Sequence, residues 1–322
     1  MRTLRSIPAA ADTPIALTIG NFDGVHLGHQ AMLARLIETA RNRGLPACAM
    51  TFEPQPREFF APDRAPARLT SMREKLELLA SAGMERAYVC RFDYRFAQIA
   101  PDDFVERILA RGLGVKHVLV GDDFRFGARR AGDIAVLNTH AARLGYSVEA
   151  MSSVTLDGVR VSSTAVREAL AAGDLLRAER LLGRPYGISG RVVRGDGLGR
   201  KLGFPTANVQ MKHNRPPLAG IFAVEVSGAR ETKVRGAASL GVRPTVKLAA
   251  APVLEVYLFD FGGDLYGRHV RVEFLHKLRD EEKFADLAAL TRQIASDVEE
   301  TRAFFQSRDE AAINRVGSGT AH

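Results

Sequence analysis

Two histidines in a glycine-rich segment are the residues of this chain best suited to chemistry. His26 and His29 belong to the sequence Gly-Asn-Phe-Asp-Gly-Val-His-Leu-Gly-His at residues 20–29, between an apolar run at residues 15–19 and a helical pattern at residues 31–37. A helix that begins here presents unpaired N–H groups and the positive end of its dipole, which attract phosphate. Imidazoles at that terminus can add hydrogen bonds to phosphate oxygens. The segment therefore predicts a strand, a turn and a helix that bind the phosphates of a nucleotide.

The spacing of these histidines also allows other interpretations. Side chains three residues apart share one helical face, so the pair could bind a metal ion. No cysteine or further histidine nearby completes a zinc site. The pair could also be incidental on the surface. The His-x-Gly-His pattern is typical of nucleotidyltransferases, which act at the α-phosphate of a nucleoside triphosphate, and the surrounding strand, glycines and helix favour this interpretation.

Two further loops follow predicted strands of the first half. Prolines stiffen the first loop, and an ordinary rigid turn would also explain them. In the second loop, carboxylates beside glycines could position a ribose, a base or Mg²⁺, and two phenylalanines could pack against a ring. A capped turn with two core aromatics is the alternative. The candidate residues are Phe52, Pro54 and Pro56 in the first loop and Asp123, Phe124, Arg125 and Phe126 in the second.

A hydroxyl-rich segment opens another predicted helix near residue 163. Hydroxyls at a helix start are ordinary N-caps. Arg167 is less expected in the first turns, because the positive end of the dipole disfavours a cation there. With Ser163 and Thr164 it could stabilise charge on the β- and γ-phosphates of a nucleotide. A plain capped helix remains the alternative.

A second glycine-rich loop lies at residues 195–203. Its glycines let backbone amides approach phosphates closely. The helix expected after a dinucleotide-binding loop and the Gly-Lys-Ser/Thr ending of a Walker A loop are both missing from the sequence. Thr206 and Asn208 then offer oxygen ligands suited to Mg²⁺ bound with nucleotide phosphates. A mobile loop followed by a Pro-Thr turn would also explain the segment, whose candidate phosphate-binding residues are Gly195, Gly199, Arg200 and Gly203.

Glu255 is a carboxylate in an otherwise apolar, alternating run at residues 254–259. An exposed strand face is the default explanation. If the side chain instead faces a pocket, it could accept a proton from a substrate hydroxyl.

The composition of the 322 residues suits two globular domains, since 46% of the residues are hydrophobic. The net charge of +8 is dispersed, which favours small anionic nucleotides over nucleic acid as ligands. We see no apolar run of membrane-spanning length and no secretory signal. Cys48 and Cys90 suit buried thiols in a reducing compartment. We therefore expect a cytoplasmic monomer or weak homo-oligomer that binds small molecules, with no nucleic-acid or membrane partner.

The order of strands and helices predicts two folds in succession. Five strand patterns alternate with helical patterns up to residue 151, which predicts a doubly wound parallel sheet of Rossmann-like type. From residue 188, five β-rich runs separated by Gly and Pro predict an antiparallel barrel, closed by a helix at residues 284–305. We expect domains at residues 1–184 and 185–306, followed by a disordered tail at residues 307–322.

Together these motifs resemble the prokaryotic-type bifunctional riboflavin kinase/FMN adenylyltransferases, also called bifunctional FAD synthetases. The resemblance extends from about residue 15 to residue 305, with all motifs in the same order. It rests on the segment at residues 20–29, on Ser-Ser-Thr-x-x-Arg at residues 162–167 and on Gly-Phe-Pro-Thr-Ala-Asn at residues 203–208. It implies an N-terminal nucleotidyltransferase domain and a C-terminal β-barrel riboflavin kinase domain.

The resemblance also implies roles for the candidate residues. The C-terminal domain would phosphorylate riboflavin to FMN with ATP, using Glu255 as the base and Thr206 and Asn208 as ligands of Mg²⁺ and nucleotide. The N-terminal domain would adenylylate FMN to FAD and release pyrophosphate, with His26 and His29 at the α-phosphate. The residues implied in ATP binding there are Gly20, Asn21, Asp23, Gly28, Asp123, Ser163 and Thr164, with Arg167 in catalysis. Flavin binding is assigned to Phe52, Pro54, Pro56, Phe124, Arg125, Phe126 and Arg243.

This chain departs from the family pattern at three single positions and in an alanine-rich segment at residues 247–252. Gln55 replaces a histidine between two prolines, Phe222 replaces a tyrosine, and Tyr257 stands where a histidine often follows the catalytic glutamate. These changes leave the core chemistry intact and bear on flavin affinity and loop closure.

Three other functions compete with this interpretation. A nucleotidyltransferase for another phosphorylated acceptor does not explain residues 203–208. A class I aminoacyl-tRNA synthetase would carry a Lys-Met-Ser-Lys segment, which this sequence lacks. A regulator that binds flavin without catalysis would not need Glu255 or Asn208, and both are present.

Overall fold

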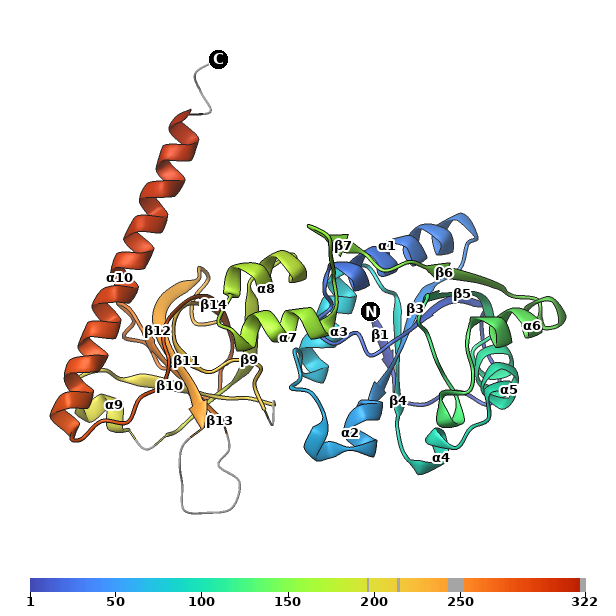
Figure 1. Ribbon diagram of the computed structural model, residues 1–322, viewed down its shortest axis with the longest axis horizontal. Coiled ribbons are helices and arrows are strands. Elements are labelled where there is room, and N and C mark those ends of the chain that lie inside the picture. The colour runs from blue at the N-terminus through green and yellow to red at the C-terminus, as the bar shows by residue number, and fades with distance from the viewer. Residues whose placement is uncertain (196, 213–214, 243–251, 319–322) are drawn as a thin grey trace. The chain divides into compact units, whose positions relative to one another are not determined.

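A parallel sheet forms the centre of the first of two compact units, Met1–Ala165 and Val166–His322 (Figure 1). The computed structural model describes residues 1–195, 197–212, 215–242 and 252–318. The sheet order is β1-β4-β3-β2-β5-β6, and all its pairings are parallel. Its strands are β1 (Arg2–Leu4), β2 (Ile15–Ile19), β3 (Ala47–Glu53), β4 (Arg86–Arg91), β5 (Val115–Gly121) and β6 (Ser147–Met151). The predicted doubly wound sheet is confirmed.

The position of β2 determines where a ligand site can form. Its two neighbours are β3 and β5, so the chain is wound outward from β2 in both directions. Open sheets of this kind bind ligands beyond the carboxyl ends of the strands where the winding reverses. That position in this chain is occupied by residues 20–29.

Helices cover both faces of the sheet. Helices α1 and α3 pack on one face, and the π-helix η2 and helix α6 pack on the other. The helices of this unit are α1 (Leu27–Asn42), α2 (Pro56–Phe60), η1 (Pro62–Arg64), α3 (Met72–Ser81), α4 (Tyr94–Ala97), α5 (Pro101–Asp103), η2 (Phe104–Gly112), η3 (Ala128–Arg130) and α6 (Ile134–Leu144). A short hairpin, β7 (Thr155–Leu156) and β8 (Val159–Arg160), precedes α7 (Ser163–Ala171).

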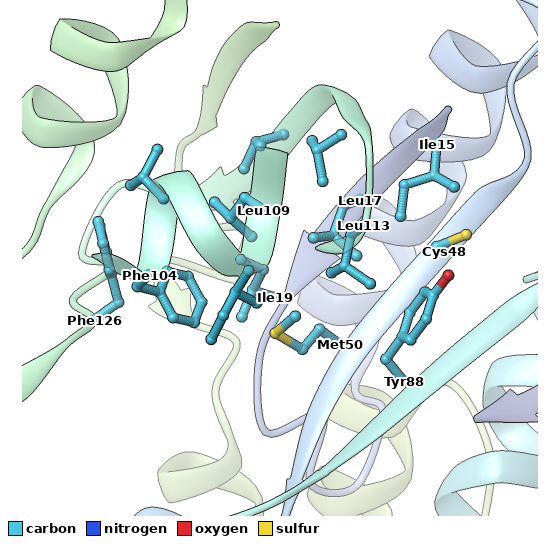
Figure 2. Close-up of a cluster of buried hydrophobic side chains, with 14 of the residues drawn as sticks. Ile15, Leu17, Ile19, Cys48, Met50, Tyr88, Phe104, Leu109, Leu113 and Phe126 are labelled. Carbon is cyan, nitrogen blue, oxygen red and sulfur yellow. The ribbon is translucent and has the colours of Figure 1, made fainter. Parts of the chain in front are cut away.

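The core of the first unit follows the alternation of strand side chains. Ile15, Leu17 and Ile19 of β2 lie in the cluster shown in Figure 2, whereas Ala16 belongs to the cluster under α1 and α3. Phe126 lies in the first cluster and is 7% exposed. Both faces of the central strand are therefore buried, as expected for a parallel sheet covered by helices.

The second unit contains a closed barrel with strand order β10-β13-β12-β11-β14-β9, and every pairing is antiparallel. The predicted barrel is confirmed, although β10 was not among the predicted strands. The strands are β9 (Tyr186–Val193), β10 (Thr206–Gln210), β11 (Gly220–Ser227), β12 (Val234–Val242), β13 (Pro252–Leu258) and β14 (His269–Arg279). Helix α9 (Leu198–Lys201) precedes β10, and α10 (Leu287–Ser318) packs on β11, β12 and β14.

The prediction of a disordered tail is wrong for residues 307–318, because α10 continues to Ser318. The segment contains Glu, Ala and Arg residues, which favour helix. Arg235 of β12 also binds both carboxylate oxygens of Asp309 at 2.6 and 2.7 Å. This contact fixes the extension of α10 to the barrel.

The unit boundary also differs from the predicted one. The sequence predicts a boundary after residue 184, whereas the compact units divide after Ala165. Helix α8 (Leu175–Leu182) accounts for much of the difference. It buries Leu175, Ala178 and Leu181 and contacts β9 and β14, so it packs as part of the barrel unit.

Candidate functional site

The loop after β2 adopts a backbone that ordinary residues avoid. Phe22 and Val25 have φ angles of 47° and 40°, and Gly24 lies at 81°. Positive φ is costly for a β-branched residue such as valine, so surrounding contacts must hold the loop in place.

Asp23 provides such contacts from inside the loop. Its carboxylate is buried and accepts hydrogen bonds from the N–H groups of Leu69 and Thr70 and from the Thr70 hydroxyl, at 3.1–3.2 Å. Thr70 Oγ1 also accepts from the Gly24 N–H at 3.1 Å. Although Asp23 was predicted to bind ATP, its carboxylate is directed to the protein. Its structural role is to hold the loop.

The two predicted histidines lie together at the N-terminus of α1. His26 is the N-cap, and its Nδ1 accepts the His29 N–H at 3.3 Å. The imidazole rings stack with centroids 3.7 Å apart. Since His26 Nδ1 is an acceptor, a neutral His26 carries its proton on Nε2.

The protonation of His29 follows from its surroundings. Burial lowers the pKa of His29 well below its usual value, and the nearby His26 and Lys75 lower it further. Its Nδ1 is buried without a hydrogen-bond partner among the described residues. At neutral pH, His29 is therefore an uncharged imidazole that can donate one hydrogen bond to a ligand.

The start of α7 meets the same loop. Ser162 Oγ caps the helix by accepting the Ala165 N–H at 3.1 Å, and Ser163 Oγ donates to the Asp23 carbonyl at 2.8 Å. A Cβ on Gly28 would lie 3.2 Å from the His26 ring and 3.4 Å from the Val161 carbonyl oxygen, so only glycine fits comfortably there. Two helix N-termini thus converge on residues 23–28, and this arrangement suits phosphate.

The remaining predicted nucleotide and flavin residues lie on several segments of the chain. Gly20 and Asn21 lie in the same loop as Asp23, and Thr164 and Arg167 follow Ser163 on α7. Asp123 forms an exposed ion pair with Arg160, and Arg125 forms one with Asp133. Pro56 begins α2, directly after Pro54 and Gln55.

The aromatic residues proposed for flavin binding differ in exposure. Phe126 is buried in the core and stacks on Phe124, so the alternative of a core aromatic applies to it. Phe52 is half-buried and packs against Phe92 and Phe96 at centroid distances of 5.9 and 5.6 Å.

Sequence reasoning missed Lys75 in α3. It is fully buried, and its Nζ donates to Thr51 Oγ1 at 3.3 Å. Burial lowers its pKa to about 8, although the nearby Asp23 carboxylate opposes the shift. The Ser71-x-x-Glu74 capping box directly before it is recognisable in the sequence and is confirmed. The sequence gives no sign that the lysine in the next position is buried, because lysine is almost always exposed.

The second unit contains a cavity of about 750 Å³ beside the barrel. Asn208 of β10 and Glu255 of β13 are direct cross-strand partners, and both line it with Thr206 and Gly199. Gly195 packs against Asn208, because a Cβ there would lie 2.4 Å from the amide nitrogen. The predicted kinase residues from two distant segments are therefore brought into one cavity.

Other predicted residues of this unit lie elsewhere. Among the described residues, Arg200 and Gly203 do not line the cavity. Arg200 instead lines a smaller one of about 310 Å³, together with Ala207 of β10 and Val256 of β13. Arg243 lies outside the described residues.

Two of the sequence departures can be located in the barrel. Phe222 is fully buried and packs on Phe274, while its neighbour Ile221 lines the cavity. Tyr257 lines the cavity and makes an edge contact with Phe204 at 5.6 Å.

Several other lining residues of the cavity were not predicted from the sequence. They include Ser239, whose hydroxyl donates to Glu281 at 3.4 Å, and the ion pair between Arg279 and Asp297. Ser239 is the cross-strand partner of Glu255 on the other side.

The donor set of this cavity fits a divalent cation held jointly with a nucleotide. A hydroxyl, an amide oxygen and a carboxylate are hard oxygen ligands, and Mg²⁺ in such sites takes few protein ligands and completes its shell with phosphate and water. Among the described residues there is no group of three His, Cys, Asp or Glu side chains that could hold a metal alone. The protein oxygens of this cavity could therefore bind Mg²⁺ as part of a metal–nucleotide complex.

Comparison with known proteins covers both units. A family model described as FAD synthetase matches residues 9–165, and one described as riboflavin kinase matches residues 182–305. The bifunctional riboflavin kinase/FMN adenylyltransferase of Escherichia coli (strain K12) is 48% identical over 305 residues, 95% of this chain and 97% of the relative. The protein of that name from Pseudomonas fluorescens is 52% identical over 286 residues, 89% and 91% of the two chains.

A crystal structure described as a macrolide-efflux protein from Streptococcus pneumoniae is also similar. It has a TM-score of 0.80 and 28% sequence identity, over 94% of this chain and 99% of that one. In the part of this chain that the structure describes, no helix is both long enough and apolar enough to cross a membrane. The two family models and the near-complete similarity to the curated relatives lead to one assignment: the chain belongs to the bifunctional riboflavin kinase/FMN adenylyltransferase family.

Proposed function

We propose that the two units of this chain divide the two activities of its family. The second unit phosphorylates riboflavin to FMN with ATP, and the first adenylylates FMN to FAD with a second ATP and releases pyrophosphate. The kinase assignment rests on one observation: Asn208 and Glu255 are cross-strand partners that line the same cavity. The convergence of two helix N-termini on one histidine-bearing loop supports the adenylyltransferase assignment.

In the kinase reaction, the riboflavin 5′-hydroxyl attacks the γ-phosphorus of ATP and the bond to the β-phosphate oxygen breaks. Glu255 accepts the hydroxyl proton. Thr206 and Asn208 hold the phosphates together with Mg²⁺, which supplies neutralisation of their charge when bound. The backbone of Gly195 and Gly199 approaches closely because neither residue has a side chain.

In the adenylyltransferase reaction, a phosphate oxygen of FMN attacks the α-phosphorus of ATP, and the bond to the pyrophosphate oxygen breaks. The nucleophile is already an anion, so the protein need not supply a base. His26 and His29 donate hydrogen bonds to the α-phosphate, where charge develops in the transition state. Ser163, Thr164 and Arg167 stabilise the leaving pyrophosphate.

Binding of the remaining groups is assigned to residues around these sites. In the first unit, the backbone of Gly20, Asn21 and Gly28 admits the phosphates, and Asp123 contacts the adenylate. Phe52 and Phe124 contact the flavin beside Pro54, Pro56 and Arg125. The partners of the chain are small molecules rather than nucleic acid or membrane, and it acts as a monomer or weak homo-oligomer. The two buried, free cysteines suit a reducing compartment, and we propose the cytoplasm.

Chromatography of flavins tests these assignments directly. The chain is incubated with riboflavin, ATP and Mg²⁺, and in parallel with FMN, ATP and Mg²⁺. We expect FMN followed by FAD in the first mixture, FAD in the second, and no product after chelation of the metal. FAD from FMN without FMN from riboflavin would contradict the kinase assignment, and the reverse would contradict the adenylyltransferase assignment.

A further inference from the structure

A buried lysine lies behind the loop that bears the two histidines. Lys75 is 1% exposed. Its Nζ donates to the Thr51 hydroxyl oxygen at 3.3 Å, and that hydroxyl donates to the Asn21 carbonyl at 3.2 Å. The Thr51 hydroxyl therefore connects the ammonium group to the loop by two hydrogen bonds. Because Lys75 is buried, a substrate cannot contact it directly.

Charged and titratable groups from several segments surround this ammonium group. They come from the loop itself, the end of β3, α2, the segment before α3, and α1: Asp23, Glu53, Glu58, Arg68 and His29. Arg68 binds both glutamates at 2.5–3.1 Å. Among the neighbouring charges, Asp23 contributes most to keeping Lys75 protonated.

Burial of this charge is expensive for the fold. A buried ammonium loses its hydration, and the first turns of a helix disfavour a cation. A methionine would fill the same volume without either cost. Costly, pKa-shifted groups of this kind cluster at functional sites.

We propose that Lys75 is a positioning residue for adenylyl transfer, which holds the loop of residues 21–29 through Thr51 and Asp23 and keeps a positive charge behind the phosphates of ATP. This proposal rests on the adenylyltransferase function of the first unit. When Lys75 loses its proton, the charge behind the loop disappears and the phosphates bind less tightly. Adenylyl transfer should then fall as the pH rises through about 8, whereas riboflavin phosphorylation in the second unit should not follow this titration.

The test compares both activities of the full-length chain from about pH 6 to about pH 10. FAD formation from FMN and FMN formation from riboflavin are measured for the wild type, Lys75→Met, Thr51→Val and, as a control, Lys116→Met, which changes an exposed lysine of the same unit. We expect Lys75→Met to lower kcat/KM for ATP in FAD formation by about 10- to 100-fold at neutral pH and to lose the decline above pH 8. Thr51→Val should lose less and keep the decline, and Lys116→Met should match the wild type.

Several results would overturn the proposal. The proposal is wrong if Lys75→Met has an unchanged kcat/KM and an unchanged pH profile. If that variant does not fold, the proposal is wrong if wild-type FAD formation shows no decline above pH 8. A wild type that makes no FAD from FMN at any pH would instead contradict the function itself, so the two failures can be told apart.

Discussion

An ion pair in the wall of the barrel cavity allows a quantitative test of the structure. Arg279 Nε and Nη2 lie 2.8 and 2.7 Å from the two carboxylate oxygens of Asp297, and these side chains are 18% and 7% exposed. Gln293 donates to the same carboxylate at 3.0 Å. The pair joins the end of β14 to α10, so it fixes the helix that closes the cavity.

The substitution Asp297→Asn keeps the shape of the side chain and removes its charge. Loss of one partner of a buried ion pair costs about 3–5 kcal/mol, because the other charge stays buried without compensation. We expect the lower end, about 3 kcal/mol, since asparagine keeps one acceptor oxygen and Arg279 keeps its bond to the Asp280 carbonyl. For a unit of this size, the unfolding midpoint should fall by about 6–12 °C.

Calorimetry and flavin assays measure this effect together. The second unit should unfold earlier and riboflavin phosphorylation should weaken, while FAD formation from FMN stays at the wild-type level. Asp260→Asn, which breaks an exposed pair with Arg302, is the control and should cost less than about 1 kcal/mol. The double variant Arg279→Met/Asp297→Leu should recover most of the loss. A cost below about 1 kcal/mol for Asp297→Asn would refute the reasoning.

Three further predictions concern single residues. His29→Ala should lower FAD formation from FMN about 100-fold or more and leave FMN formation intact, and equal loss of both in a folded variant would contradict two separate sites. Glu255→Gln should lower FMN formation about 100-fold or more and spare FAD formation from added FMN, so a wild-type kcat for FMN formation would exclude it as the base. The pKa of Lys75 is lowered from 10.5 to about 8, so the unfolded chain binds more protons between these values. The first unit should gain about 3 kcal/mol as the pH rises through that range, and urea unfolding of Lys75→Met should lack this gain.

Much of the adenylyltransferase site was predictable because its signals are local. An apolar run, glycines and a helical period predict the strand, turn and helix that carry His26 and His29, and the structure contains β2, the loop and α1 in that order. The hydroxyl-rich start of α7 was recognisable for the same reason.

The residues that the sequence analysis missed depend on distant contacts. β10 is short and partly polar, and it becomes a strand through pairing with β9 and β13. Phe126 looked available to a ligand, but it belongs to the core because η2 and the sheet enclose it. Lys75 has the sequence context of a surface lysine and is buried because α3 packs behind the loop.

Residue type and short-range periodicity were enough to predict the two fold types, the order of the motifs and the chemical groups available to each reaction. Which of those groups meet depends on the packing of segments that lie far apart in the chain. Asp23 binds the backbone of Leu69 and Thr70, 46 and 47 residues away along the chain, and Asn208 faces Glu255 only because β10 and β13 pair. Burial and strand register arise from packing between distant segments, and no local pattern specifies them.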